Sequence, residues 1–134
     1  MTEQAAPASL HVLVVDDNRD AADTLAEVLK IMGCRTATAY DGLEGVEKAE
    51  QLRPHAVVLD LGMPRLNGYE ACQRIRALPW GKAVRLVAVS GWGQQEDRRR
   101  SMEAGFDAHL VKPVAPDELM KLLGAGRSQP HRLG

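Results

Sequence analysis

The sequence has only two cysteines, no marked excess of either charge and no long apolar run, and each shortage excludes a class of protein. Cys34 and Cys72 cannot form a disulfide framework, and the spacing of Cys and His residues resembles no zinc site. Because 17 Lys and Arg residues stand against 18 Asp and Glu residues, the net charge of -1 gives no global field to attract nucleic acid. Any activity is therefore expected in local sites.

Membrane-spanning and export signals are also missing from the pattern. The longest apolar run, Val84–Val89, is interrupted by Arg85 and is far shorter than the roughly 20 residues that span a bilayer. Met1–Ser9 are small and polar, without the basic start and apolar core of an export signal. The basic run Arg98–Arg100 lies among acidic residues and is interpreted as a solvated helix face. We expect a soluble, cytoplasmic protein with no membrane partner and no nucleic acid partner.

What is present is an ordinary globular composition, with 45% hydrophobic and 26% charged residues in a chain of 134, which suits one domain. Short apolar segments alternate with amphipathic segments of helical period. The predicted strands are Leu10–Val15, Cys34–Tyr40, Ala56–Leu59, Val84–Val89 and Ala108–Val111. Predicted helices follow Asn18, the Asp41–Gly42 turn, the Asp60–Asn67 loop, Gly93 and Ala115, and the last ends at Gly124.

This alternation predicts an α/β fold, a three-layer doubly wound parallel sheet with right-handed crossovers and helices on both faces. We assign the domain to residues 10–124, with flexible tails at 1–9 and 125–134. In such sheets ligands bind beyond the carboxyl ends of the strands, where the connecting loops converge. The residues at those strand ends are therefore the candidates for chemistry.

Five polar side chains follow strands at this edge, namely Asp16, Asp17, Asp60, Ser90 and Lys112. Each one alone is explained by a helix cap or a turn, but the topology assigns all of them to the same rim. Three neighbouring carboxylates repel unless a cation lies among them, and Mg²⁺ prefers such oxygen ligands. A carboxylate can also attack phosphorus, in which case Asp60 forms an acyl phosphate that Lys112 neutralises and Ser90 contacts.

Four segments resemble the motifs of a known family: VLVVDDN at Asp16 and Asp17, VVLDLGMPRLNGYE at Asp60, VAVSGWG at Ser90, and GFDAHLVKPV at Lys112. In this order and spacing, residues 10–123 resemble the receiver domains of two-component response regulators. The resemblance implies a flavodoxin-like sheet of five parallel strands in the order 2-1-3-4-5. It also implies that Asp60 is the phosphoacceptor.

The resemblance further assigns a metal site beside the phosphoacceptor. Asp17, Asp60 and the carbonyl of Gly62 are the expected ligands of Mg²⁺, and Asp16 is expected to hold a metal-bound water. Ser90 and Lys112 are expected to hold the phosphoryl group. These assignments follow from the family and not from spacing alone.

Two further family features fall near the lysine. The peptide bond between Lys112 and Pro113 is expected to be cis. The family's switch draws the Ser90 hydroxyl toward the phosphoryl group, which opens space for an aromatic ring three residues before the lysine. Here that residue is His109, for which two interpretations stay open. It is either a switch ring that phosphorylation turns from solvent into an apolar slot beside Ser90, where it would be neutral, or a half-exposed strand histidine.

The expected function is a phosphorylatable receiver that accepts a phosphoryl group from a phosphohistidine partner, either a histidine kinase or a histidine phosphotransfer protein. It is expected to be a phosphoacceptor rather than an enzyme, to assist its own phosphorylation and slow dephosphorylation, and to signal through a downstream protein partner. About eleven residues follow the last predicted helix, too few for an output domain. Homodimerisation stays open, as does the choice between a free-standing regulator and the receiver of a hybrid sensor histidine kinase.

Two alternatives use the same rim differently. A small Mg²⁺-dependent phosphatase with an aspartyl nucleophile would carry D-x-D-x-T/V after its first strand, whereas this chain has Asp16, Asp17 and Asn18 in succession. It would also need a substrate cap for which the chain has no room. A receiver-shaped binding module that is never phosphorylated would be expected to lack part of the residue set, and none is missing.

Overall fold

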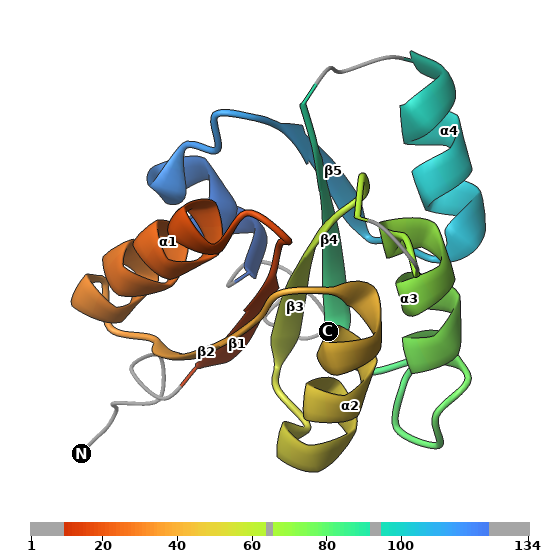
Figure 1. Cartoon of the computed structure of the whole chain (residues 1–134), viewed down its shortest axis with the longest axis horizontal. Helices are drawn as coiled ribbons and strands as arrows, with labels where there is room; N and C mark the ends of the chain where they lie inside the picture. The colour runs from red at the N-terminus through yellow and green to blue at the C-terminus, as the bar shows by residue number, and fades with distance from the viewer. Residues whose placement is uncertain (1–9, 64–65, 92–94, 124–134) are drawn as a thin grey trace, which may run out of the picture.

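The five predicted strands form a single parallel sheet (Figure 1). The structure, a computed structural model, describes residues 10–63, 66–91 and 95–123, so the predicted tails at 1–9 and 125–134 lie outside the described residues. The strands are β1 (His11–Val15), β2 (Arg35–Ala39), β3 (Ala56–Asp60), β4 (Arg85–Ser90) and β5 (Ala108–Val111). Their order is β2-β1-β3-β4-β5 with every pair parallel, which confirms the predicted fold class and strand order.

Helices cover both faces of the sheet, as a three-layer fold requires (Figure 1). They are α1 (Arg19–Ile31), α2 (Gly42–Leu52), α3 (Gly68–Arg76), α4 (Gln95–Ala104) and a last helix over residues 116–123. The apolar residues of α1 and of the last helix share one buried cluster, and those of α2, α3 and α4 contribute to the other. The sheet therefore lies between two helical layers.

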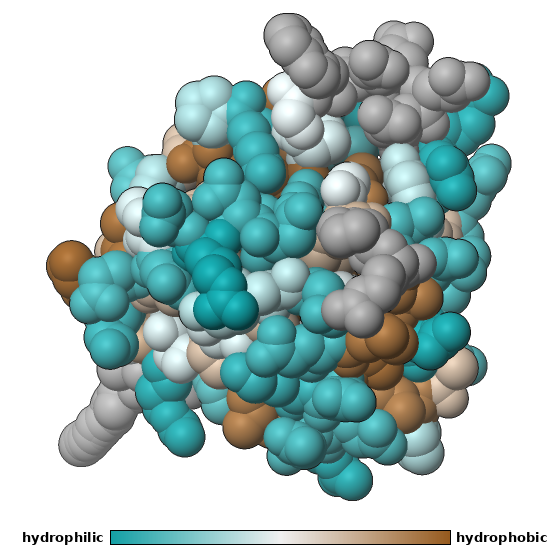
Figure 2. All heavy atoms as spheres, viewed as in Figure 1, coloured by the Kyte–Doolittle hydropathy of each residue, from teal (hydrophilic) through white to brown (hydrophobic). Residues whose placement is uncertain are grey.

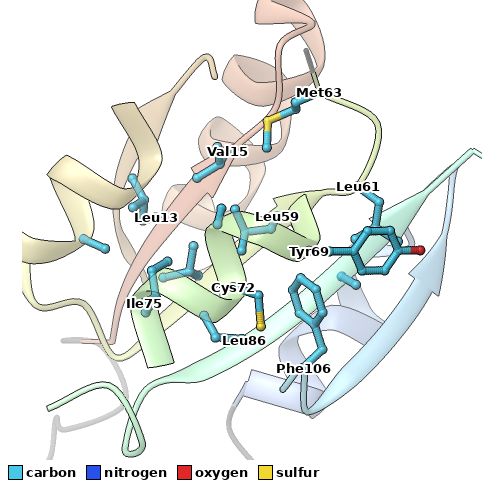
Figure 3. Close-up of a cluster of buried hydrophobic side chains, with 14 of the residues drawn as sticks. Leu13, Val15, Leu59, Leu61, Met63, Tyr69, Cys72, Ile75, Leu86 and Phe106 are labelled. Atoms are coloured by element: carbon cyan, nitrogen blue, oxygen red, sulfur yellow. The ribbon is translucent and has the colours of Figure 1, made fainter. Parts of the chain in front are cut away.

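Alternate residues of the central strands face the two helical layers. Val12 and Val14 of β1 point to the α1 side, whereas Leu13 and Val15 point to the α2 and α3 side. Figure 3 shows part of the second cluster, where side chains of β1, β3 and β4 meet α3. Because both faces of the inner strands are buried, their sequences are almost continuously apolar.

Side-chain caps fix where the helices begin. The Asn18 side chain accepts a hydrogen bond from the N–H of Ala21 at 3.1 Å, which confirms it as the N-cap of α1. Asp41 caps α2 in the same way, so Gly42 is the first residue of that helix and not part of a turn. A Cβ atom at Gly42 would collide with the backbone carbonyl of Leu66, which explains the glycine.

Two strands run one residue further than predicted, because β3 includes Asp60 and β4 includes Ser90. The sheet itself therefore positions both of these polar side chains.

Both cysteines are buried and free, and burial raises the pKa of the Cys72 thiol to about 12.

The outer surface is largely polar on the face shown in Figure 2, where apolar side chains gather only in small groups. Large exposed apolar residues are few in the described ranges, and they are Ile31, Met32, Leu43, Leu52 and Met102. Within those ranges, none of the helices is both long enough and apolar enough to pass through a bilayer.

Candidate functional site

The predicted polar residues meet at the carboxyl edge of the sheet. Asp60 and Ser90 are the last residues of β3 and β4, while Asp16 and Lys112 directly follow β1 and β5. Hydrogen bonds of the sheet continue into this edge, since the N–H of Lys112 donates to the carbonyl of Ser90 at 2.8 Å. The N–H of Asp16 likewise donates to the carbonyl of Ala39 at 3.1 Å. Hydrogen bonds to neighbouring strands therefore hold the backbone at Asp16 and Lys112.

Asp16, Asp17 and Asp60 bring their carboxylates together. One oxygen from each lies within 4.8 Å of the others. Asp16 and Asp60 are buried, with 7% and 8% of their surface exposed, whereas Asp17 is exposed and opens the cluster to solvent on one side. Three hard oxygen donors at this spacing, with one open side, fit a small divalent cation that keeps some of its waters.

Lys112 supplies the positive charge of the cluster. Its Nζ lies 3.2 Å from Oδ2 of Asp16 and 3.8 Å from Oδ1 of Asp60. The predicted contact with Asp60 is present, but the ammonium lies nearer to Asp16, which spacing alone does not indicate. The Lys112–Pro113 peptide bond is cis, as expected from the family resemblance.

One ammonium does not fully compensate the three carboxylates. Burial, and after it the negative charge of Asp16, raise the pKa of Asp60 from its ordinary value of 3.8 to about 6. The Lys112 charge and the N–H of Gly62, which donates to Oδ1 of Asp60 at 3.3 Å, oppose this increase only in part. The charged form of Asp60 therefore gains from a further cation, which is the electrostatic condition for a metal site.

Gly62 leaves the approach to Asp60 open. The residue is exposed, and a Cβ atom built there would meet no heavy atom within 4 Å. No side chain at this position therefore covers the Asp60 carboxylate. The predicted metal contact of the Gly62 carbonyl stays a prediction.

His109 lies differently from the expectation. Its ring is buried, with 8% of the residue exposed, and Nε2 lies 2.8 Å from Oγ of Ser90. Its other ring nitrogen, Nδ1, lies 3.1 Å from Oγ of Ser101 on α4. The expected exposure of His109 is wrong for this structure, because a hydroxyl meets each ring nitrogen and removes much of the cost of burial. The position of the ring after phosphorylation stays a prediction.

Ser101 is the site residue that the sequence did not reveal. It is fully buried on α4, a helix whose sequence is too polar to indicate which face packs inward. The three exposed arginines Arg98–Arg100 bear out the solvated face that was expected of them. A buried polar residue on a polar helix gives no signal in the pattern, so only its contact with His109 identifies it.

An apolar cavity of about 680 Å³ lies beside the carboxylates, between α1 and the segment that follows β5. Ala21, Leu25 and Val28 of α1 line one side. Pro113 and Val114 line the other, and Asp60 and Lys112 contribute to its wall. The Asp60 carboxylate therefore borders this cavity.

A parallel sheet of this order, with an acidic cluster, a lysine and a hydroxyl at its carboxyl edge, defines a receiver-type signalling domain. The family model of the response regulator receiver domain matches residues 12–124. The chain belongs to this family, which confirms the resemblance drawn from its motifs.

Individual relatives agree with this assignment. The transcriptional regulatory protein PrrA of Mycobacterium tuberculosis is 39% identical to this chain over 112 residues. Those residues make up 84% of this chain and 47% of PrrA, so the chain spans about half the length of that relative. The chemotaxis protein CheY4 of Vibrio cholerae superposes with a TM-score of 0.82 at 27% identity and covers 87% of this chain and 98% of its own. The receiver domain of sensor histidine kinase PA1611 of Pseudomonas aeruginosa has a TM-score of 0.80 at 32% identity, covers 87% and 96%, and holds a magnesium ion in its active site cleft.

Proposed function

We propose that this receiver accepts a phosphoryl group on Asp60, in a reaction that requires Mg²⁺, from the phosphohistidine of a kinase or phosphotransfer protein. The observation that carries the proposal is the position of Asp60. It is a buried carboxylate at the end of the central strand, with two further carboxylates and an ammonium close to its oxygens. Asp60 ends the central strand β3, between β1, which Asp16 follows, and β4, which ends at Ser90.

Asp16, Asp17, Asp60 and the Gly62 carbonyl are the residues that would hold the metal. Bound there, Mg²⁺ would neutralise carboxylate and phosphoryl oxygens, a role that its preference for oxygen ligands suits. The raised pKa of Asp60 supports this assignment, because burial and then the negative charge of Asp16 disfavour the carboxylate, and a bound cation would offset both effects. The relative from Pseudomonas aeruginosa, with its magnesium ion in the active site cleft, adds an independent argument.

Asp60, Lys112 and Ser90 then have different roles in phosphoryl transfer. An ionised Asp60 oxygen attacks phosphorus while the bond from phosphorus to the donor imidazole nitrogen breaks. Lys112 offsets the negative charge of the acyl phosphate, and the Ser90 hydroxyl donates a hydrogen bond to a phosphoryl oxygen. A pKa of about 6 leaves Asp60 mainly ionised at neutral pH, as an attacking carboxylate must be.

The cavity beside α1 suggests how the donor protein approaches. A phosphohistidine must reach Asp60 on a protein surface, and the apolar groove lined by Leu25 and Val28 leads to that carboxylate. The downstream protein partner is assigned to the exposed surface of α4, which carries Arg98–Arg100 and Met102.

Two buried, free thiols suit a reducing cytoplasm.

The phosphatase alternative gains no support from the site. Its nucleophile would follow the first strand, whereas the buried and perturbed carboxylate here ends β3. We therefore retain phosphoacceptance as the function. The chain acts as a signalling domain whether it is free-standing or the receiver of a hybrid kinase.

The test is the mass of the intact protein after incubation with Mg²⁺ and acetyl phosphate. The wild type should gain one phosphoryl group, and Asp60→Asn should gain none. Asp117→Asn, which removes an exposed carboxylate on the last helix, is the matched control and should behave as the wild type. An unchanged wild-type mass, under conditions that modify another receiver, would refute the proposal.

A further inference from the structure

We propose that Ser101 is a positioning residue that acts on Ser90 through His109, so that phosphorylation of Asp60 and protonation of His109 favour each other. The inference rests on the proposed function, because it takes Ser90 as the hydroxyl that contacts the phosphoryl group. It assigns a role to Ser101 that no motif of the sequence indicates.

The contacts of Ser101 determine which ring nitrogen of His109 carries hydrogen. Oγ of Ser101 lies 2.9 Å from the backbone carbonyl oxygen of Arg98, and a carbonyl can only accept. The single hydroxyl proton of Ser101 therefore lies on that bond. At its 3.1 Å contact with Nδ1 of His109, Ser101 must then accept, so Nδ1 carries hydrogen.

The second contact of the ring determines the direction of the Ser90 hydroxyl. A neutral imidazole with hydrogen on Nδ1 has only a lone pair on Nε2. The Ser90 Oγ atom, 2.8 Å away, therefore donates its proton to Nε2. In the unphosphorylated protein this proton is committed to His109 and is not available to an oxygen on Asp60.

The three side chains in this chain of hydrogen bonds are all buried. Ser101 has no exposed surface, and Ser90 and His109 have 7% and 8%, so water is a poor substitute partner for any of the three. A buried polar group left without a partner costs about 1 to 3 kcal/mol. The chain of hydrogen bonds must therefore rearrange as a unit when one member changes partner.

Phosphorylation forces such a change. When Ser90 gives its proton to a phosphoryl oxygen, Nε2 of His109 loses its donor. Uptake of one proton from solvent at Nε2 restores the contact, because the imidazolium N–H then donates to Oγ of Ser90. Ser90 can donate to the phosphoryl oxygen and accept from His109 together, whereas the neutral ring allows only one of these contacts.

The charges around the ring favour the same coupling. The guanidinium of Arg98 donates to the His109 carbonyl at 3.5 Å, and Lys112 directly follows the strand that carries His109. Arg100 of α4 lies over the ring of Tyr69 on α3, and α4 packs against β5. The anions of the rim are the carboxylate cluster of Asp60. Phosphorylation replaces the single negative charge of the Asp60 carboxylate with the roughly two negative charges of an acyl phosphate, and this added charge favours an imidazolium at His109.

Linkage gives the sign of the pH dependence. If phosphorylation increases the proton affinity of His109, protonation of His109 must stabilise the phosphorylated form by the same factor. Lower pH, within the range where His109 titrates, therefore favours the phosphorylated state. This is opposite to the sequence-based expectation, in which the buried ring was neutral after activation.

Substitution of Ser101 should break the coupling. In Ser101→Ala, Nδ1 loses its acceptor, and a neutral ring can carry its hydrogen on Nε2 and donate to Ser90. The Ser90 proton is then free for the phosphoryl oxygen without proton uptake. Ser101→Thr keeps the hydroxyl and is the matched control.

The test is NMR of the full chain with labelled histidine nitrogens, with Mg²⁺ present in every sample and with and without beryllofluoride as the phosphoryl mimic. The free wild type at neutral pH should carry hydrogen on Nδ1 of His109. Beryllofluoride should move the midpoint of its ring titration to higher pH by about one unit, equivalent to about tenfold tighter binding on the acid side. Ser101→Ala should move the hydrogen to Nε2 and abolish the shift, and Ser101→Thr should retain both features.

Three results would overturn the inference: hydrogen on Nε2 in the wild type, equal titration midpoints in both states, or an undiminished shift in Ser101→Ala. The first two need no variant, so they decide the matter even if Ser101→Ala does not fold. Beryllofluoride binding with an unmoved His109 midpoint leaves phosphoacceptance intact and refutes only the coupling. Failure of the wild type to bind beryllofluoride with Mg²⁺ refutes both proposals.

Discussion

At the scale of single residues, Asp60 is the carboxylate of the rim whose ionisation the fold opposes most clearly. It is buried and close to Asp16, and its pKa of about 6 records both effects. The Lys112 ammonium lies within salt-bridge distance of both Asp16 and Asp60 and does not pair with one of them alone. The fold therefore holds a buried carboxylate in an arrangement that a metal ion would stabilise.

This predicts how stability depends on pH in metal-free protein. Because the pKa of Asp60 is higher in the folded chain than its ordinary 3.8, the protonated carboxyl favours folding. The contribution is fully present below about pH 4 and is lost as pH rises through about 6, by on the order of 2 to 3 kcal/mol. Urea unfolding in EDTA at pH 4 and pH 7.5 measures it. Asp60→Asn should remove this part of the pH dependence, and a variant with the full wild-type dependence would contradict the assignment.

The same repulsion predicts stabilisation by magnesium. Mg²⁺ should raise the melting temperature. At a Mg²⁺ concentration one hundred times its Kd, the free energy of unfolding should rise by about 2.7 kcal/mol. Asp17→Ala should abolish this response and leave the metal-free protein folded, because Asp17 is exposed. Asp20→Ala, an exposed acid in the first turn of α1, is the control that should keep the response. Unchanged Mg²⁺ affinity in Asp17→Ala would show that Asp17 is not a ligand.

At the scale of elements, the apolar strands and the helix caps were predictable because local chemistry determines them. β1 and β3 are buried on both faces and read as apolar runs, and Asn18 satisfies free N–H groups at the start of α1. The ends of β3 and β4 were less predictable, since Asp60 and Ser90 are polar residues that look like loop positions. Sheet pairing, a long-range effect, decides that they belong to the strands.

The residues of the candidate site likewise fall into two groups, those that the sequence predicts and those that it does not. Its five rim residues could be predicted because each follows a strand that the pattern identifies. Ser101 and the buried position of His109 could not, because they depend on how α4 packs across β5. The polar sequence of α4 carries no period that reveals this packing.

The start of α2 offers a test of close packing between elements. Gly42→Ala should lower the free energy of unfolding by about 1 to 3 kcal/mol, because the new methyl group would collide with the carbonyl of Leu66. Gly62→Ala is the matched control in open space, and its effect should lie within about 0.5 kcal/mol. Equal losses in the two variants, measured by urea unfolding, would refute this explanation of the glycine.

At the scale of the whole molecule, a net charge of -1 leaves recognition to local surfaces. The acidic rim opens toward the groove at α1 on one side. On the other side, the Ser90 and His109 contacts lead to α4. In the proposed function, the rim therefore connects the groove assigned to the phosphoryl donor with the α4 surface assigned to the downstream partner.

The central claim is that Asp60, and neither of its acidic neighbours, forms the acyl phosphate. Borohydride reduction of the phosphorylated protein cleaves an aspartyl phosphate to homoserine, and peptide mass spectrometry then identifies the modified position. The account predicts homoserine at position 60 alone, and only when Mg²⁺ was present during phosphorylation. Homoserine at position 16 or 17, or equal modification without Mg²⁺, would contradict it.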